Sequence, residues 1–276
     1  MGRKEWPKGA WSHSRFEVLR RCPRAHKIKY VERIVPLGLP PFNLEVGVGF
    51  HRVLEAVGNA VMLGEDSSPE RWDAAVLEAR GKCSDGKAAL EVTRLGNSYQ
   101  QRWGCANAGY PKDCKLIGVE KTLFGGTLHA AMGGYAAIAD GLCEGSKGLE
   151  VYEHKTAARM PSGSYEEVVR KLKVGSQACS LAYCAWKTLG EIPCVVRNII
   201  TKTKVPDVAR FTLKFTEDEL LKWEQDQVEL EQLVGLTCAN RDACAPVVGF
   251  ECDYLAYCHG TEADKELYGP RVSSKE

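Results

Sequence analysis

The chain has 276 residues, of which 44% are apolar and 26% charged, a balance that supports a folded core and excludes collagen, coiled coil and wholly disordered chains. Its 37 basic and 36 acidic residues nearly cancel, so any strongly charged surface must come from local clusters. No apolar run is long enough for a membrane span, and the first residues lack the apolar stretch of a signal peptide. We therefore expect a cytoplasmic protein without membrane association, in a compartment where disulfides rarely persist.

The N-terminal region is predicted to be helical and basic. Its first 33 residues carry ten basic side chains against three acidic ones. Apolar residues at helical spacing predict a first helix over residues 12–30, capped by Ser12 or Ser14. A second helix is predicted over residues 45–62, and His51 and Glu55, four residues apart, share one of its faces.

The pattern then divides into a helical insertion and a strand-rich core. Residues 65–112 predict two further polar helices, and from Leu116 onward the spacing changes to the two-residue period of strands. The elements predicted next are strands at 117–123, 135–143 and 149–156, a helix at 165–189, a hairpin at 195–201 and 209–215, and a last helix from a Thr216–Glu219 capping box to about Leu236.

These elements predict an α/β fold in which a central mixed sheet is flanked by helices. We interpret the chain as a single domain. Its parts are an N-terminal pair of helices (1–64), the helical insertion (65–112), the core (113–215), and a last helix with a cysteine-rich tail (216–276).

Asp140, Glu153 and Lys155 form the most informative group of residues. If Ser146 and Lys147 form the turn of a hairpin, Asp140 lies opposite Glu153 in the paired strands. Directly opposed Cβ atoms lie about 4.5–5.5 Å apart, so two carboxylates there repel each other unless a positive charge separates them. Strand alternation places Lys155 on the same face as Glu153. The group predicts a site for Mg²⁺ or Mn²⁺, and the alternative is an ordinary ladder of surface charges.

Asp140 followed by Glu153-His154-Lys155 resembles the core motif of the PD-(D/E)xK nucleases, whose fold is the restriction-endonuclease-like core. The residue before Asp140 is Ala139, where that motif has proline. The other matching segments resemble the RecB-like branch of the superfamily, which includes iron–sulfur exonucleases of CRISPR adaptation and of phages. They are Ser14-Arg-Phe16, Cys22-Pro-Arg24, Gly49-Phe-His51 with Glu55, Gln177 with Tyr183, and Cys252 to Cys258.

The resemblance implies a role for each matching residue. His51, Asp140, Glu153 and the backbone carbonyl of His154 would hold a divalent cation, and Lys155 would position the attacking water. Gln177 would orient Lys155, the water or a DNA phosphate. Glu55 and Glu120 would be outer carboxylates, and the role of Tyr183 is unassigned. The basic face of the first helix would contact DNA; the alternative is an ordinary solvated face. Its arginines are Arg15, Arg20, Arg21 and Arg24.

Four cysteines crowd into the C-terminal region and predict a metal site: Cys238, Cys244, Cys252 and Cys258. By themselves they could bind Zn²⁺, although their spacing lacks the Cys-x-x-Cys pairs of zinc ribbons. The resembled branch takes one ligand from the Cys-Pro motif and three from the tail, which implies a [4Fe–4S] cluster on Cys22, Cys244, Cys252 and Cys258. Cys238 is then spare. A set of reduced, unligated thiols is the remaining alternative.

We therefore expect a metal-dependent deoxyribonuclease. The resemblance favours an exonuclease that acts on DNA ends or single strands in recombination, repair, phage replication or CRISPR adaptation. Its partners would be DNA and either recombination or adaptation proteins or a second copy of the chain. The alternative is a catalytically silent DNA-binding accessory protein of the same fold, with a structural zinc or iron–sulfur site. No phosphate-binding loop of the Gly-x-x-x-x-Gly-Lys kind occurs in the sequence.

Overall fold

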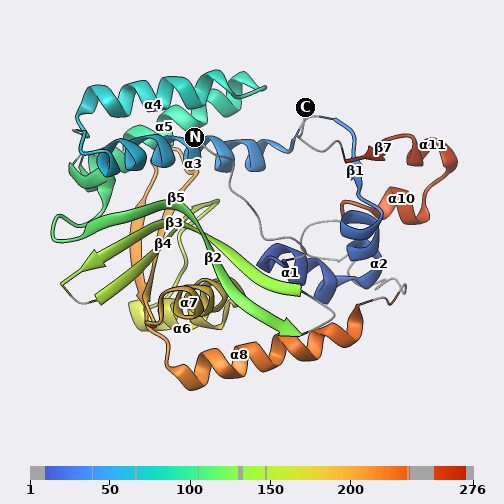
Figure 1. The fold of residues 1–276 in the computed structure, drawn as a ribbon. Helices are drawn as coiled ribbons and strands as arrows, with labels where there is room; N and C mark the ends of the chain where they lie inside the picture. Colours follow the sequence, from blue (N-terminus) through green and yellow to red (C-terminus); the bar gives the residue numbers. More distant parts are fainter. Residues whose placement is uncertain are drawn as a thin grey trace.

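A five-stranded mixed sheet forms the centre of the computed structural model, which describes residues 10–38, 40–65, 67–104, 106–129, 133–146, 148–234, 236 and 252–271 (Figure 1). The strands, in spatial order, are β2 (Lys115–His129), β3 (Gly133–Gly145), β4 (Gly148–Ala157), β5 (Cys194–Thr201) and β6 (Val208–Leu213). β4 and β5 pair in parallel, and the other neighbours pair antiparallel. The predicted central mixed sheet is confirmed.

Three helices cover one face of the sheet. They are α3 (Phe42–Met62), α4 (Pro69–Gly81) and α5 (Gly86–Trp103), so the two helices expected in the insertion are confirmed. Phe50 of α3, Trp72 of α4 and Tyr99 of α5 are fully buried and pack in one cluster with Tyr152 of β4. This cluster fixes α3, which carries His51, against the sheet.

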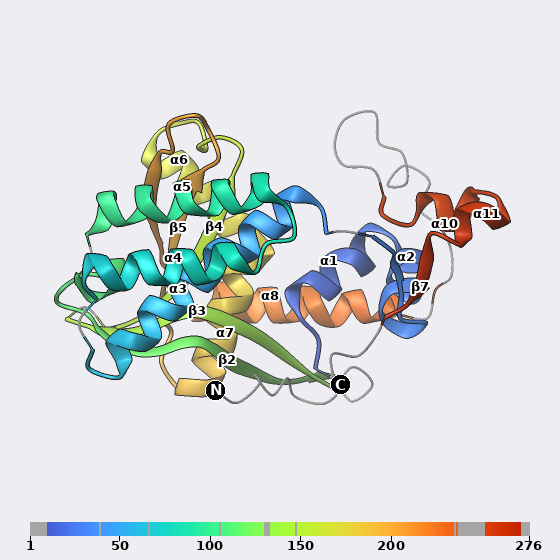
Figure 2. The same ribbon diagram turned by 90° about the horizontal axis from the view of Figure 1, so that it is seen from above.

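The opposite face is covered by α1 (His13–Arg21), α7 (Ser176–Leu189) and α8 (Glu217–Leu230), with α6 (Tyr165–Val174) beside β6 (Figures 1 and 2). Leu19, Tyr135, Tyr183 and Trp223 belong to its buried core. The capping box predicted at Thr216 is confirmed, because Thr216 N–H donates to Glu219 Oε2 at 2.8 Å and Glu219 N–H donates to Thr216 Oγ1 at 3.2 Å.

A small terminal module, residues 22–36 with 252–271, lies beside this layered core (Figure 2). It joins both ends of the chain, because β1 (Ile34–Pro36) pairs antiparallel with β7 (Tyr268–Pro270). The module also contains α2 (Pro23–His26) and a π-helical turn (Lys27–Val31), which precede β1, and α10 (Leu255–His259) and α11 (Glu262–Lys265), which precede β7. Its buried cluster consists of Cys22, Ala25, Ile28 and Tyr254.

Three predicted helices differ from the observed ones. The helix expected over residues 12–30 breaks at Cys22, which is extended, because the proline that follows disfavours helical backbone at the residue before it. The helix expected over 165–189 is interrupted at Gly175, which has ψ 121°, and this gives α6 and α7. The last helix ends at Leu230 and continues as a 3₁₀ turn to Leu233, short of the expected Leu236.

Candidate metal centre

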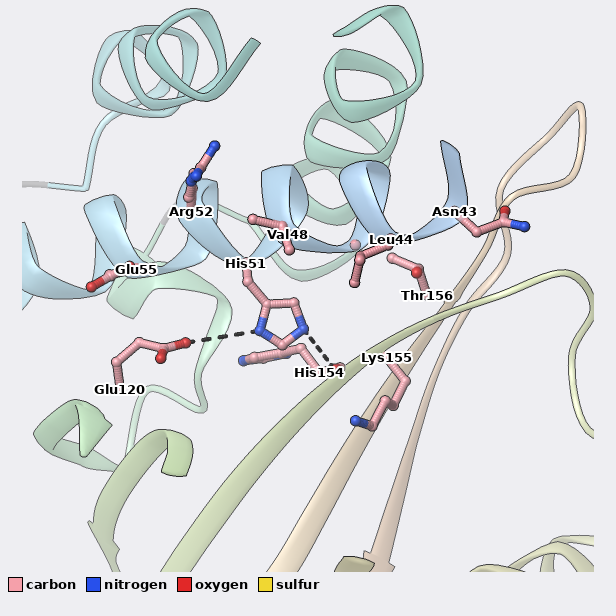
Figure 3. A pocket seen from close by; sticks show the side chains of 11 residues that line it. Asn43, Leu44, Val48, His51, Arg52, Glu55, Glu120, His154, Lys155 and Thr156 are labelled. Atoms are coloured by element: carbon pink, nitrogen blue, oxygen red, sulfur yellow. Dashed lines mark hydrogen bonds and ion pairs between the residues drawn. The ribbon is translucent and has the colours of Figure 1, made fainter. Parts of the chain in front are cut away.

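Three elements bring His51, Glu120 and Asp140 together at one side of the sheet. His51 comes from α3, Glu120 from β2 and Asp140 from β3, and one ligand atom of each lies within 4.8 Å of the others. His51 Nδ1 lies 3.8 Å from Glu120 Oε1 (Figure 3). The same nitrogen lies 3.2 Å from Asp140 Oδ1. An imidazole nitrogen and two carboxylates are donors that a divalent cation accepts.

The backbone of β4 fixes two members of this group. The carbonyl oxygen of His154 accepts a hydrogen bond from His51 Nε2 at 3.0 Å (Figure 3). The N–H of His154 donates to Asp140 Oδ2 at 2.6 Å. Nδ1 of His51 therefore faces the carboxylates. Burial alone would lower the pKa of His51, but Asp140 and Glu120 outweigh it and raise that pKa to about 10. The site thus attracts positive charge.

Glu120 adopts a backbone conformation that is rare inside a strand. Its φ is +50°, in the left-handed region that disfavours residues other than glycine. Its neighbours pair as Val119 with Gly141 and Lys121 with Ala139, so Glu120 stands across from Asp140. Residues held in such conformations cluster at functional sites, where the surrounding structure compensates for the strain.

Glu153 lies outside this group of three, because its carboxylate is bound by two cationic side chains. Arg197 Nε donates to Glu153 Oε2 at 2.6 Å, and Lys155 Nζ lies 3.0 Å from Glu153 Oε1. The pairing follows from register, because Glu153 and Arg197 are opposite each other in the parallel β4–β5 ladder. Burial alone would raise the pKa of Glu153, but Lys155 and Arg197 lower it below its usual value. The repulsion expected between Asp140 and Glu153 is therefore relieved separately at each carboxylate.

The side chain of His154 lies edge-on to the His51 ring, with ring centroids 6.4 Å apart, and its nitrogens face other partners. It is buried, with Nδ1 3.2 Å from Asn198 Nδ2 and 3.5 Å from the Tyr99 hydroxyl, and with Nε2 3.5 Å from the Tyr110 hydroxyl. Burial and the neighbouring His51 hold its pKa well below the usual value. The hydrogen bonds of His154 to His51 and Asp140 thus come from its backbone, which includes the carbonyl that the sequence resemblance singled out.

A cavity of about 470 Å³ opens over the metal group (Figure 3). Its lining includes His51, Glu120 and Lys155, and also Glu55, which lies one helical turn beyond His51 on α3. The Lys155 side chain is 38% exposed, so its ammonium group can meet both the solvent and the buried Glu153. Glu55 lines the same cavity, and the role of outer carboxylate that the resemblance implies for it stays a prediction.

Gln177 and Tyr183, both on α7, lie outside this cavity. Gln177 lines a separate cavity of about 210 Å³ together with His13 of α1, and His13 is within electrostatic range of Glu153 and Lys155. The Tyr183 hydroxyl donates to Glu224 Oε1 at 2.5 Å, and its ring packs on Trp223. Tyr183 therefore belongs to the core. The orienting role expected for Gln177 stays a prediction.

The predicted DNA-binding arginines have different surroundings. The Arg15 guanidinium lies 3.8 Å from the centre of the Trp11 ring, and its Nε donates to His26 Nε2 at 3.2 Å, so Arg15 holds α1 against α2. Arg20 is exposed and paired with Glu17. Arg21 is exposed, and Arg24, on α2 of the terminal module, is half-buried.

Three of the four predicted cluster cysteines meet in the terminal module. Cys22 is buried, and Cys252 and Cys258 pack against the same cluster around Tyr254. None of these three forms a disulfide. Cys238 and Cys244 lie outside the described residues.

Sequence reasoning missed Arg197, which binds Glu153, and Asn198, which binds His154. A usable signal was present. Residues 194–201 read as an almost wholly apolar strand interrupted by one arginine and one asparagine, and polar side chains in a buried strand need partners.

Comparisons with known proteins identify the family and the fold. A family model described as PD-(D/E)XK nuclease superfamily matches residues 10–259, so the chain belongs to that superfamily. A search of curated proteins found no match. The fold is similar to the crystal structure of a protein from Eubacterium rectale named "Putative exonuclease", with 10% identity, a TM-score of 0.55, and coverage of 95% of this chain and 99% of that one. Among the described residues, no helix has the length and apolar character of a membrane span.

Proposed function

We propose that the protein is a metal-dependent DNA exonuclease of the RecB-like branch. The observation that carries this proposal is the convergence of His51, Glu120 and Asp140 on one point beside Lys155. The superfamily to which the chain belongs is one of nucleases, and the cavity over the group is open to substrate.

The donor set fits Mg²⁺ or Mn²⁺. His51 offers Nδ1, because its Nε2 is committed to the His154 carbonyl, and Asp140 and Glu120 offer carboxylate oxygens. The other two ligands expected from the sequence come from β4: the His154 carbonyl accepts from His51 Nε2, and Glu153 is paired with Lys155 beside the group. A bound cation would stabilise charge on the scissile phosphate and on the leaving oxygen.

Lys155 is the side chain of the protein that would act on the water and the phosphate directly. Its ammonium group, held by Glu153 Oε1, reaches the cavity wall, where it can orient a water and stabilise negative charge on the phosphate. Arg197 keeps Glu153 ionised and in place, so Lys155 stays oriented. Gln177 would act on the same group from the side of α7.

The decisive test is cleavage of end-labelled DNA in Mg²⁺, in Mn²⁺ and in EDTA, with Lys155→Gln beside the natural protein. We expect cleavage that needs the cation and is lost in the variant. Linear, circular and end-blocked substrates then separate an exonuclease from an endonuclease. DNA binding without cleavage under every condition would instead identify a silent accessory protein.

We further propose a [4Fe–4S] cluster on Cys22, Cys244, Cys252 and Cys258. The meeting of Cys22 with Cys252 and Cys258 in one module supports it, since the first comes from the other end of the chain. Protein purified without oxygen should be brown and carry about four irons per chain. Stoichiometric zinc without iron would assign the site to zinc.

The biological setting is also a proposal. The resemblance favours DNA recombination, repair, phage replication or CRISPR adaptation, in the cytoplasm, with protein partners of that pathway or with a second copy of the chain. Size-exclusion chromatography with light scattering, with and without DNA, tests self-association.

A further inference from the structure

The side chain of His154 has no part in the reaction described so far. Its ring is buried between Glu153 and Lys155 in the sequence and lies next to the ring of His51 (Figure 3). A buried polar side chain is costly unless its hydrogen-bonding groups have partners, whereas an apolar residue would fill the same place without any. The ring of His154 has partners at both nitrogens, so the protein maintains polar contacts here that packing alone does not require.

These partners assign the tautomer of the ring. Arg210 Nε of β6 donates to Asn198 Oδ1 at 2.8 Å, so the amide nitrogen of Asn198 is the group that faces His154 Nδ1, at 3.2 Å. An amide nitrogen only donates, so Nδ1 accepts and the proton of the neutral ring lies on Nε2. Nε2 then donates to the hydroxyl oxygen of Tyr110, 3.5 Å away. Burial holds the pKa of His154 well below its usual value, in agreement with a neutral ring.

The segment that follows α5 anchors both sides of this arrangement. Arg210 Nη2 donates to the carbonyl of Gly109 at 2.8 Å. Tyr110 follows a turn in which Asn107 and Ala108 both have φ +53°, in the left-handed region that disfavours residues other than glycine. The Asn107 amide stabilises that turn by donating to two backbone carbonyls beyond it, at 2.7 and 2.8 Å. The end of the helical insertion thus determines where the partners of His154 lie.

The peptide groups on either side of the His154 Cα bind two members of the metal group. The N–H donates to Asp140 and the carbonyl accepts from His51. β4 is paired with β5 at this point, but its ladder with β3 ends at the pair Gly141–Tyr152. On the β3 side, the N–H of His154 therefore binds a side chain instead of a strand. The orientation of these peptide groups then depends on the β5 ladder and on whatever holds the His154 ring.

We propose that His154 and Asn198 are positioning residues of the metal centre. The ring of His154, held at both nitrogens, fixes the two peptide groups that orient His51 and Asp140 toward a cation. This inference rests on the proposed nuclease function, and it gives the helical insertion a part in the site, since Tyr110 comes from its end. Neither residue touches the substrate in this role. Both act through the ligands, as groups behind metal ligands commonly do.

The first experiment measures Mn²⁺ binding by calorimetry, without DNA. Asn198→Leu keeps the branched shape of the side chain and removes the donor to His154 Nδ1, so Mn²⁺ affinity should fall about tenfold. The matched control is Gln227→Met, which removes a buried amide on α8 that donates to the Trp223 carbonyl at 3.3 Å. The control should lose stability and keep the Mn²⁺ affinity of the natural protein. Equal Mn²⁺ affinities in Asn198→Leu and Gln227→Met would overturn the inference.

A milder variant covers the case in which Asn198→Leu does not fold. Tyr110→Phe removes only the acceptor of His154 Nε2 and should weaken Mn²⁺ binding about threefold. Its control is Tyr254→Phe, a buried tyrosine of the terminal module whose hydroxyl donates to the Ile34 carbonyl at 3.0 Å. If the two phenylalanine variants bind Mn²⁺ equally well, the ring of His154 has no positioning role.

The dependence of cleavage on Mn²⁺ concentration separates positioning from chemistry. In the variant Asn198→Leu, the Mn²⁺ concentration for half-maximal cleavage should rise about tenfold, and the rate at saturating Mn²⁺ should stay within about threefold of the natural rate. A lost saturated rate with an unchanged half-maximal concentration would contradict a positioning role.

The two proposals can fail separately. If the natural protein binds Mn²⁺, Asn198→Leu weakens that binding and no DNA is cleaved, the positioning role stands and the nuclease function falls. If the natural protein cleaves DNA, and Asn198→Leu and Gln227→Met need the same Mn²⁺ concentration, the nuclease function stands and the positioning role falls. A natural protein that neither binds Mn²⁺ nor cleaves DNA would refute both.

Discussion

The metal group and the terminal module are stabilised in different ways. In the metal group, the backbone of β4 binds His51 and Asp140, and Arg197 binds the neighbouring Glu153. A large buried cluster lies on each face of the sheet that carries them. The terminal module has a buried cluster of four residues and a pair of three-residue strands. Apolar burial can therefore hold the first in place without metal, whereas the second has little apolar area to stabilise it.

This difference indicates what each metal would do. At the sheet, a cation would enter a site whose ligands are already oriented, so its loss should cost activity and little stability. In the module, ligation of cysteines from both ends of the chain would supply much of the stabilisation, as it does in small metal-dependent domains. The following predictions test that separation, beginning with the largest effect.

Asp140→Asn should abolish cleavage and leave the fold intact. The amide oxygen can still accept from the N–H of His154, but the charge that faces His51 Nδ1 and the cation is gone. We expect cleavage to fall by several orders of magnitude, measured on labelled DNA, with a melting temperature close to that of the natural protein. Glu144→Gln, an exposed carboxylate on the same strand, is the control. Cleavage by Asp140→Asn at near the natural rate would refute the site.

The two cations that bind Glu153 should behave differently when removed. Arg197→Gln leaves a buried carboxylate without its main partner and should destabilise the protein by about 3–5 kcal/mol. Lys155→Gln removes a partner that is 38% exposed, so stability should change little while cleavage is lost. Denaturant unfolding and the cleavage assay measure the two effects. Equal stability losses in both variants would contradict the assignment of Arg197 as the structural partner.

Local pattern explains why part of the site could be predicted from sequence. The hairpin of β3 and β4 was predicted from its turn, and the observed pairs Gly145–Gly148 and Gly141–Tyr152 confirm that register. The helical spacing around His51 likewise predicted α3, although α3 begins earlier, at Phe42.

The remaining features depend on distant pairing or on backbone shape. Arg197 lies opposite Glu153 because β4 and β5 pair in parallel, and α6 and α7 separate these two strands in the sequence. No local sequence pattern contains the register of two strands that are so far apart. The left-handed φ of Glu120 is equally invisible, because glutamate gives no sign of it. By contrast, the helix breaks next to Pro23 and at Gly175 occur at residue types that interrupt helices. A stricter use of the proline and glycine rules would have predicted both breaks.

Acid should loosen the terminal module, because a buried histidine there must take up a proton. His26 is buried with its Nε2 accepting from Arg15, and burial lowers its pKa from 6.5 to about 4. Between those two values the unfolded state binds the proton and the folded state does not, so stability falls as the pH drops through that window, by at most about 3 kcal/mol. Limited proteolysis across pH 7 to 4 should cut near the module first.

His26→Gln retains an acceptor for Arg15 and does not titrate, so its protease resistance should depend less on pH. His259→Gln, at the exposed end of α10, is the control. If His26→Gln and the natural protein lose resistance at the same pH, His26 is not the group responsible.

The smallest and most specific test compares two capping boxes, one at the start of α8 on the sheet core and one at the start of α11 in the terminal module. Thr216 caps α8, which packs on the core through Leu220 and Trp223, so Thr216→Ala should lower the free energy of unfolding by about 1 kcal/mol. Thr261 makes the same reciprocal bonds with Asp264 at the start of α11, a four-residue helix with no buried side chain. Thr261→Ala should therefore leave the main unfolding transition unchanged, because the free energy that it removes belongs to a segment that opens on its own. Hydrogen exchange should show faster exchange in the module of Thr261→Ala alone. A drop of equal size in the main transition for both variants would mean that the module and the sheet unfold as one cooperative unit.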